Sequence, residues 1–315
     1  MTPLPVELAC HLAPCPPERH WLIEGLWADQ AVGIVGGEPK CCKSFLALDM
    51  AVAVGSGAPC LRRFPVVRTG RVLLFAAEDA LHVVRERLEG ICGAASVRLA
   101  DLDIQVITAP TLRLDLGADQ QRLAETVSSL RPLLLVLDPF VRLHRIDENA
   151  SAEVAPLLAY LRDLQRRFAL AVALVHHARK GAARLRDGQA LRGSSDFHAW
   201  GDSNLYLRRR GEELVLAVEH RAAPSRTGIR LGLLGASGSL ALAVLDETPT
   251  ASTAQPAASP LDKIEQVLAD ASEPVPLAGL RHSCHMRTAT LCETLAQLTK
   301  TGRVVKTAAG YKLAS

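Results

Sequence analysis

A lysine–serine pair after a glycine-rich turn is the first group of residues in this chain that could bind a nucleotide. The stretch "IVGGEPKCCKSFLALD", residues 34–49, runs from an apolar segment through the turn into an amphipathic one. It fits the phosphate-loop pattern G-x-x-x-x-G-K-[ST] at Gly37, Lys43 and Ser44, with Cys42 at the position of the second glycine. The predicted nucleotide-binding residues are Gly37, Glu38, Pro39, Lys40, Cys41, Cys42, Lys43 and Ser44.

In such a loop, backbone N–H groups and the positive end of the following helix surround phosphate groups. Lys43 would reach the terminal phosphate of ATP, and the Ser44 hydroxyl would bind Mg2+. A β-carbon at Cys42 restricts the backbone where glycine is usual, so we expect weakened nucleotide binding but not its absence. The alternative, an ordinary turn with a buried serine, fits the strand before it and the helix after it less well.

Carboxylates follow two further apolar segments. Asp138 ends "LLLVLD" (133–138), and Glu78 and Asp79 follow "RVLLFAA" (71–77). If both segments are parallel strands, their carboxyl ends meet at the sheet edge that holds the phosphate loop. We predict that Asp138 binds Mg2+ and that Glu78 is the general base for the attacking water. Either acid alone could equally be a solvated carboxylate at a strand end.

Two histidines, His176 and His177, end the apolar segment "LAVALVHH" (170–177). Neighbouring residues of a strand point to opposite faces, which makes the pair unsuitable as joint ligands of one metal. One of them is expected to sense the bound phosphate instead. The stretch 176–195 is long, basic and glycine-containing, and loops of this length are usually functional or disordered.

The wider pattern predicts an α/β fold. Short apolar segments alternate with helical ones, such as residues 82 to about 91 with Glu and Arg on the exposed face, which indicates a mostly parallel sheet covered on both sides. Beyond Ser195, four short apolar segments predict antiparallel strands that extend one edge of the sheet. The small, polar, proline-containing stretch 246–259 predicts a flexible linker between a domain at 1–245 and another at 260–315.

Residues 260–315 show three helical patterns followed by two strands, which predicts a small α+β winged helix-turn-helix domain. Its third helix would enter the major groove of duplex DNA. The predicted DNA-binding residues of this domain are Arg287, Thr288, Thr290 and Lys306. Seven Lys and Arg against five Asp and Glu in 258–315 is only weakly basic, so a winged helix used for protein contacts remains an alternative.

Composition narrows the class of protein. No run of eighteen apolar residues is present, so we expect no membrane span. The eight cysteines show no C-x-x-C spacing, which favours reduced thiols in a cytoplasm. A formal net charge of +3 is too small to indicate nucleic-acid binding by itself.

An ordered set of motifs resembles one known family. "AAED", "VLDP", "RLHRIDENAS", "VHHARKGA" and "LRGSS" resemble the RepA-type hexameric replicative helicases of plasmids, within the RecA-like P-loop ATPases, over about residues 20–235. The resemblance implies a RecA-like fold, ATP and Mg2+ as cofactors, Glu78 as the catalytic base and Asp138 as the acid beside Mg2+. It also implies that His177 links nucleotide state to DNA. Arg192 matches the arginine finger that completes the neighbouring subunit's site.

The same resemblance implies DNA as the partner of a hexameric ring. The loop with Lys180, Arg184 and Arg186 would face the central channel and contact the phosphates of a single strand, while the winged helix would bind duplex. His220 and Arg221 stand where relatives have a lysine or arginine near the neighbour's phosphate. Two functions remain open: a DNA helicase, or an ATP-switched DNA-binding regulator or adaptor of a mobile element.

Overall fold

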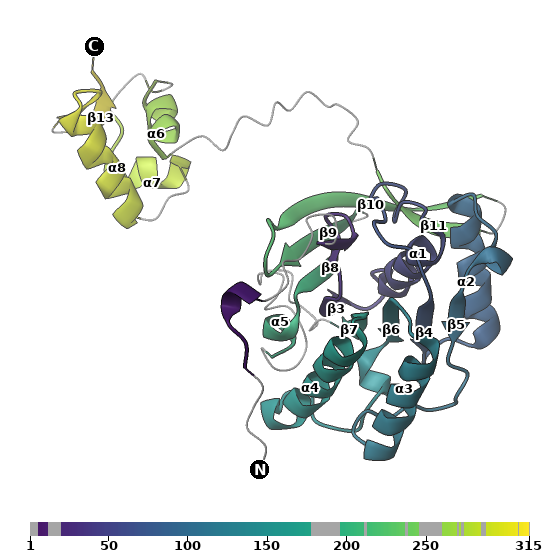
Figure 1. The fold of residues 1–315 in the computed structure, drawn as a ribbon. Coiled ribbons are helices and arrows are strands. Elements are labelled where there is room, and N and C mark those ends of the chain that lie inside the picture. The colour runs from purple at the N-terminus through teal and green to yellow at the C-terminus, as the bar shows by residue number, and fades with distance from the viewer. Residues whose placement is uncertain are drawn as a thin grey trace. The chain divides into compact units, whose positions relative to one another are not determined.

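The chain forms two compact units, Met1–Glu247 and Thr248–Ser315 (Figure 1). The structure is a computed structural model that describes residues 6–11, 20–177, 196–210, 213–236, 239–245, 260–269, 271, 274–284, 288–307 and 309–314. The predicted linker, 246–259, lies outside these residues. Of the helices that are described, none is both long and apolar enough to cross a membrane.

A nine-stranded sheet forms the centre of the larger unit, in the order β11-β10-β9-β8-β3-β7-β6-β4-β5. The strands of this sheet are β3 (Val32–Gly37), β4 (Val72–Ala76), β5 (Ile104–Val106), β6 (Leu134–Asp138), β7 (Ala171–His177), β8 (Ser203–Arg210), β9 (Glu213–His220), β10 (Arg226–Ala236) and β11 (Ser239–Val244). Neighbours from β8 to β5 pair parallel, and β9, β10 and β11 continue the sheet antiparallel. The predicted α/β fold is thus confirmed, although β8 pairs parallel with β3 and only its other edge is antiparallel.

Helices cover both faces of this sheet. They are α1 (Lys43–Ser56), α2 (Leu81–Ala94), α3 (Gly117–Leu130), α4 (Ser151–Phe168) and the short α5 (Asp196–Trp200). Along β6, Leu134 and Val136 pack in one core with α1 and α2, whereas Leu135 and Leu137 pack in the other with α3, α4 and α5. This two-residue alternation is what a strand buried on both faces requires, and it explains why the segment is apolar throughout.

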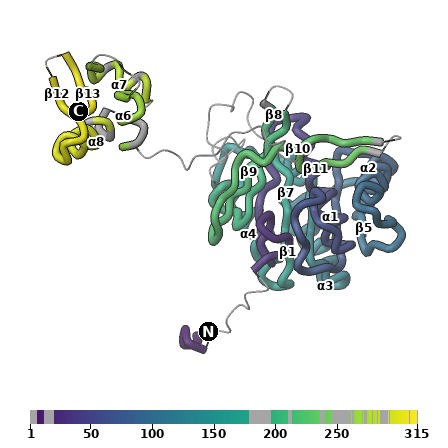
Figure 2. The backbone as a smooth tube through the Cα atoms, turned by 90° about the horizontal axis from the view of Figure 1, so that it is seen from above, coloured from purple at the N-terminus to yellow at the C-terminus, as the bar shows by residue number. Residues whose placement is uncertain are grey.

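The antiparallel strands also cover part of the helical layer. β11 contacts α2 and α1, and Figure 2 shows β10 and β11 running towards α2. Leu231 of β10 and Leu242 of β11 are buried in the same core as Leu88 of α2. A separate hairpin, β1 (Trp21–Ile23) and β2 (Trp27–Ala28), contributes the fully buried Trp27 to this core. α1, the helix that follows the phosphate loop, therefore shares its core with α2, β10, β11 and the β1–β2 hairpin.

The smaller unit consists of three helices and a two-stranded antiparallel sheet. Its elements are α6 (Pro260–Ala269), α7 (Leu277–Cys284), α8 (Thr288–Lys300), β12 (Val304–Thr307) and β13 (Gly310–Leu313). Ile264, Leu280, Leu291 and Leu295 are among the residues of its own core. Three helices followed by two strands is the order that the sequence indicates, and the assignment as a winged helix stays a prediction.

Candidate nucleotide-binding site

The predicted phosphate loop joins a buried strand to a buried helix. Every residue of β3 is buried, and so is every residue of α1 from Leu46 to Val54. Gly37 ends β3 at a point of close approach, because a β-carbon there would lie 2.4 Å from the carbonyl oxygen of Leu207. The loop from Glu38 to Cys42 is thus held at both ends by rigid elements.

Cys42 has the backbone conformation that the sequence pattern reserves for glycine. Its φ of 59° and ψ of 28° lie in the left-handed region, which costs a residue with a β-carbon about 1–2 kcal/mol. Its side chain lines the cavity beside the loop. Burial raises the pKa of the Cys42 thiol above its ordinary value, so the group is uncharged at neutral pH and does not repel a phosphate. The expected crowding is therefore steric and conformational.

Replacing Cys42 with glycine should improve nucleotide binding or hydrolysis. We expect Cys42→Gly to raise MgATP affinity or turnover about fivefold, if the glycine removes about 1 kcal/mol of backbone strain that the cysteine imposes on the phosphate-bound loop. Steady-state hydrolysis and nucleotide titration measure both quantities. Cys41→Ala is the control, because it removes the adjacent thiol at a residue without positive φ. A glycine variant slower than the wild type would show that the cysteine is an adaptation and not a handicap.

Lys43 lies inside the loop that it would use to bind phosphate. The residue is 5% exposed, and its Nζ donates a hydrogen bond of 2.8 Å to the main-chain oxygen of Glu38. Burial lowers the pKa of Lys43, and nearby acidic groups, Asp138 among them, oppose that shift. A phosphate oxygen could take the place of the carbonyl as the acceptor, with a full negative charge in addition.

Asp138 and Ser44 lie together, as their predicted shared role requires. Asp138 ends β6 with 8% of its surface exposed, and the Ser44 side chain hydrogen-bonds to it. Burial raises the pKa of Asp138 to about 6, and the carboxylates of Asp79 and Glu78 add to the shift. A buried carboxylate in this state lacks sufficient positive charge nearby. An Mg2+ ion would supply it, and a hydroxyl with one carboxylate is a fitting ligand pair.

The raised pKa predicts a pH dependence of Mg2+-nucleotide binding. Asp138 keeps its proton up to about pH 6 in the folded chain, but only up to about pH 3.9 in the unfolded chain. The protonated side chain therefore contributes fully to folding stability below about pH 3.9, and this contribution is lost as pH rises through 6. Mg2+ needs the carboxylate form, so affinity should fall as pH is lowered from 7 to 5. Titrating wild type and Asp138→Asn at each pH separates this effect from the nucleotide's own protonation. Equal slopes for both proteins would refute the assignment.

One cavity of about 310 Å3 brings the predicted groups together. Its lining residues are Lys40, Cys41, Cys42, Lys43, Ser44, Phe45, Glu78, Asp79, Arg87, Asp138, Val175 and His177. Glu78 is 43% exposed in its side chain and accepts a hydrogen bond of 3.0 Å from Arg142. Of the two histidines, His177 lines the cavity, whereas His176 is 1% exposed and stacks on Phe197. The structure thus places His177 at the cavity and His176 in the core, and phosphate sensing by His177 stays a prediction.

Among the lining residues, Phe45, Arg87 and Val175 were not predicted. Arg87 of α2 forms an ion pair with Asp79, and its guanidinium carbon lies 5.2 Å from the centroid of the Phe45 ring. The helical pattern places Arg87 on the exposed face, but its side chain is only 26% exposed. α2 packs against α1, so Arg87 reaches the residue after the phosphate-loop serine. The sole signal in the sequence is Phe45 itself, an aromatic residue at the cavity end of α1.

His220 and Arg221 lie near the amino-terminal end of β3, away from the phosphate loop. His220 pairs with Ser203 across β8 and β9, next to the start of β3, whereas the phosphate loop follows its end. Ser203 Oγ and His220 Nδ1 are 3.1 Å apart. Arg221 donates a 2.6 Å hydrogen bond to the carbonyl oxygen of Ala199. Neither residue reaches the cavity of its own chain, and a contact with a neighbouring subunit stays a prediction.

Several predicted residues cannot be placed. Those outside the described residues are Lys180, Arg184, Arg186, Arg192 and Arg287. Thr288 and Thr290 belong to α8, but their side chains are not described. Lys306 is exposed on β12, with its Nζ 5.9 Å from the centroid of the Tyr311 ring.

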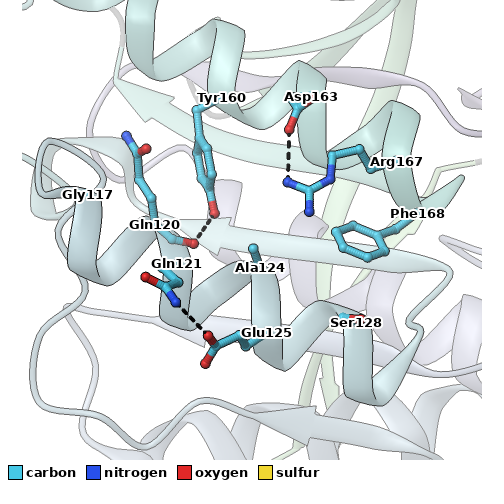
Figure 3. Close-up of a pocket in the computed structure, with 10 residues that line it drawn as sticks. All are labelled: Gly117, Gln120, Gln121, Ala124, Glu125, Ser128, Tyr160, Asp163, Arg167 and Phe168. Carbon is cyan, nitrogen blue, oxygen red and sulfur yellow. Dashed lines mark hydrogen bonds and ion pairs between the residues drawn. The ribbon is translucent and has the colours of Figure 1, made fainter.

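A larger cavity of about 570 Å3 lies between α3 and α4 and contains none of the predicted groups (Figure 3). Tyr160 donates a 2.6 Å hydrogen bond to the carbonyl oxygen of Gln120 across it. Arg167 and Asp163 form an ion pair of 3.2 Å on one side. α3 and α4 pack on the sheet face opposite α1, so this cavity is separate from the phosphate loop.

Comparison with known proteins identifies the family and the fold of the larger unit. The profile of the AAA_25 family, described as an AAA domain, matches residues 3–183, more than half of the chain. A solved ATPase domain is similar in fold, with 13% identity and a TM-score of 0.53 over 68% of this chain and 86% of that one. The RadB recombinase is also similar in fold, with 16% identity and a TM-score of 0.52 over 69% of this chain and 92% of that one.

A DnaB-like replicative helicase, solved with its interactions with primase, gives 14% identity and a TM-score of 0.51 over 67% of this chain. The match spans 56% of that helicase. At such identities the three structures establish the fold, and the profile establishes the family. The chain belongs to the AAA_25 family of AAA domains, and its larger unit has the RecA-like fold.

Proposed function

We propose that this chain binds MgATP at the phosphate loop and hydrolyses it as a DNA-binding motor of the RepA type. The proposal rests on one observation: Lys43, Ser44, Glu78, Asp138 and His177, from four separate segments of the chain, line the same cavity. A turn that merely resembled a phosphate loop would have no reason to face two carboxylates and a histidine at the carboxyl ends of neighbouring strands.

Each side chain has a distinct task in this proposal. Lys43 would exchange its bond with Glu38 for one with the terminal phosphate, and Ser44 and Asp138 would hold Mg2+. When bound, the ion neutralises charge on the phosphate oxygens. Glu78 would accept a proton from the attacking water, since its side chain lines the cavity and is 43% exposed, so that water can reach it. His177 would contact the terminal phosphate from β7.

Assembly and DNA contacts form the finer part of the proposal. We infer a hexameric ring in which Arg192 completes the neighbour's site. Lys180, Arg184 and Arg186 would bind single-stranded DNA in the channel. The smaller unit would bind duplex through Arg287, Thr288, Thr290 and Lys306. Its separate core supports this division, because a unit with its own core can bind duplex while the ring holds one strand.

The left-handed Cys42 favours a second function. A strained loop that binds ATP but turns it over slowly would suit an ATP-switched DNA-binding regulator or adaptor. Strand displacement on a forked duplex distinguishes the two functions. A motor releases the labelled strand when MgATP is added, and Asp138→Asn does not. A regulator releases none in the same assay, yet MgATP changes its affinity for the intact duplex.

A further inference from the structure

Four aromatic rings are buried next to the nucleotide cavity. We refer to Phe140, His144, His176 and Phe197 as the ring cluster; their exposed fractions are 0%, 7%, 1% and 0%. The rings of His176 and Phe197 are stacked, with centroids 4.3 Å apart and an angle of 22°. Phe140 meets both edge-on, at 5.8 Å from His176 and 5.2 Å from Phe197, and lies 4.3 Å from His144. The four rings thus form one continuous set of contacts.

Two members adjoin residues of the cavity. His176 directly precedes His177 in β7, and Phe140 follows Asp138 by two residues. Because side chains of a strand alternate, His177 faces the cavity while His176 points into the core on the opposite face. A shift of the carboxyl end of β7 or β6 towards a bound nucleotide must therefore move rings of the cluster.

A third member ties the cluster to α5. Phe197 is the buried residue of this helix, which begins just after residues 178–195. The far end of α5 is attached elsewhere: Arg162 of α4 donates to the carbonyl oxygen of Trp200 at 2.5 Å and forms an ion pair with Asp202. α5 thus contacts the ring cluster near its start, and near its end it is held by Arg162 of α4 and by Arg221.

We propose that the ring cluster transmits nucleotide occupancy from Asp138 and His177 to α5, with His176 as the positioning residue at its centre. The inference rests on the proposed nucleotide site but not on DNA binding or ring assembly. Close-packed rings do not compress, so they shift together instead of absorbing a displacement. Removing the ring of His176 should therefore uncouple α5 while the cavity groups stay in place.

Amide hydrogen exchange of the full-length chain, with and without MgADP, tests the coupling. In the wild type MgADP should slow exchange of residues 196–200 about fivefold or more, the lower range for coupled sites. His176→Leu should still bind MgADP but lose that slowing. His176→Phe, which keeps a stacked ring, should retain it. Phe75→Leu is the matched control, since it removes a ring buried in the same core but outside the cluster.

Each result decides the proposal. It is overturned if His176→Leu keeps the slowing, if Phe75→Leu loses it equally, or if the wild type binds MgADP without protecting α5. If His176→Leu fails to fold, Phe197→Leu enters the same comparison with the same expectation. A wild type that does not bind MgADP in titration would refute the proposed function and the coupling together, whereas binding without protection refutes the coupling alone.

Discussion

Lys43→Ala should lower the affinity for MgATP about 100-fold or more, the range expected when one partner of a buried charge pair is removed. The loop backbone alone would leave the terminal phosphates without a cation. The loss should be larger than the missing bond suggests, because Lys43 also lowers the pKa of Asp138. Without it that carboxyl should hold its proton to higher pH and bind Mg2+ less readily at neutral pH.

Nucleotide titration by fluorescence or calorimetry measures this change. Arg85→Ala is a suitable control, because it also removes one positive charge, from an exposed position on α2 that does not line the cavity. Both variants should unfold at temperatures close to that of the wild type. Wild-type affinity in Lys43→Ala would mean that this loop is not the nucleotide site.

The strands and the phosphate loop could be predicted because their signals are local. A segment such as β6 is apolar at every position, since it is buried on both faces, and its final carboxylate marks the sheet edge. The left-handed position was predictable too, because the pattern has a glycine where Cys42 has a φ of 59°. These features depend on neighbours in the sequence and on the direction of parallel strands.

Features that depend on packing between distant elements could not be predicted. The orientation of Arg87 towards Phe45 depends on how α2 packs against α1. Helical periodicity in the sequence does not predict this packing. Likewise, strand alternation separates His176 from His177 but does not say which faces the loop. In the structure His176 stacks on Phe197 and therefore faces away from the loop. Phe197 belongs to α5, which follows residues 178–195 and is distant in sequence from the loop.

Arg192→Ala should keep MgATP binding and lower turnover about 10³-fold or more, the usual effect of removing an arginine finger. Among the cavity's described lining residues the cations are Lys40, Lys43 and Arg87, and Arg87 is already paired with Asp79. Charge that develops on the transferred phosphoryl group would thus be only partly compensated within one chain. An arginine supplied by a neighbouring subunit would complete the site, which ties activity to assembly.

Mixing subunits makes this prediction specific. In a ring of Arg192→Ala and Glu78→Ala chains, some interfaces combine the intact base of one subunit with the intact finger of the other. Two inactive proteins should then regain part of the wild-type turnover on mixing, whereas either alone should stay inactive at every concentration. Wild-type turnover per chain should fall on dilution as rings dissociate. Turnover that is independent of protein concentration and unchanged in Arg192→Ala would refute a shared site, and the cavity of a single chain would then have to supply all the charge that hydrolysis needs.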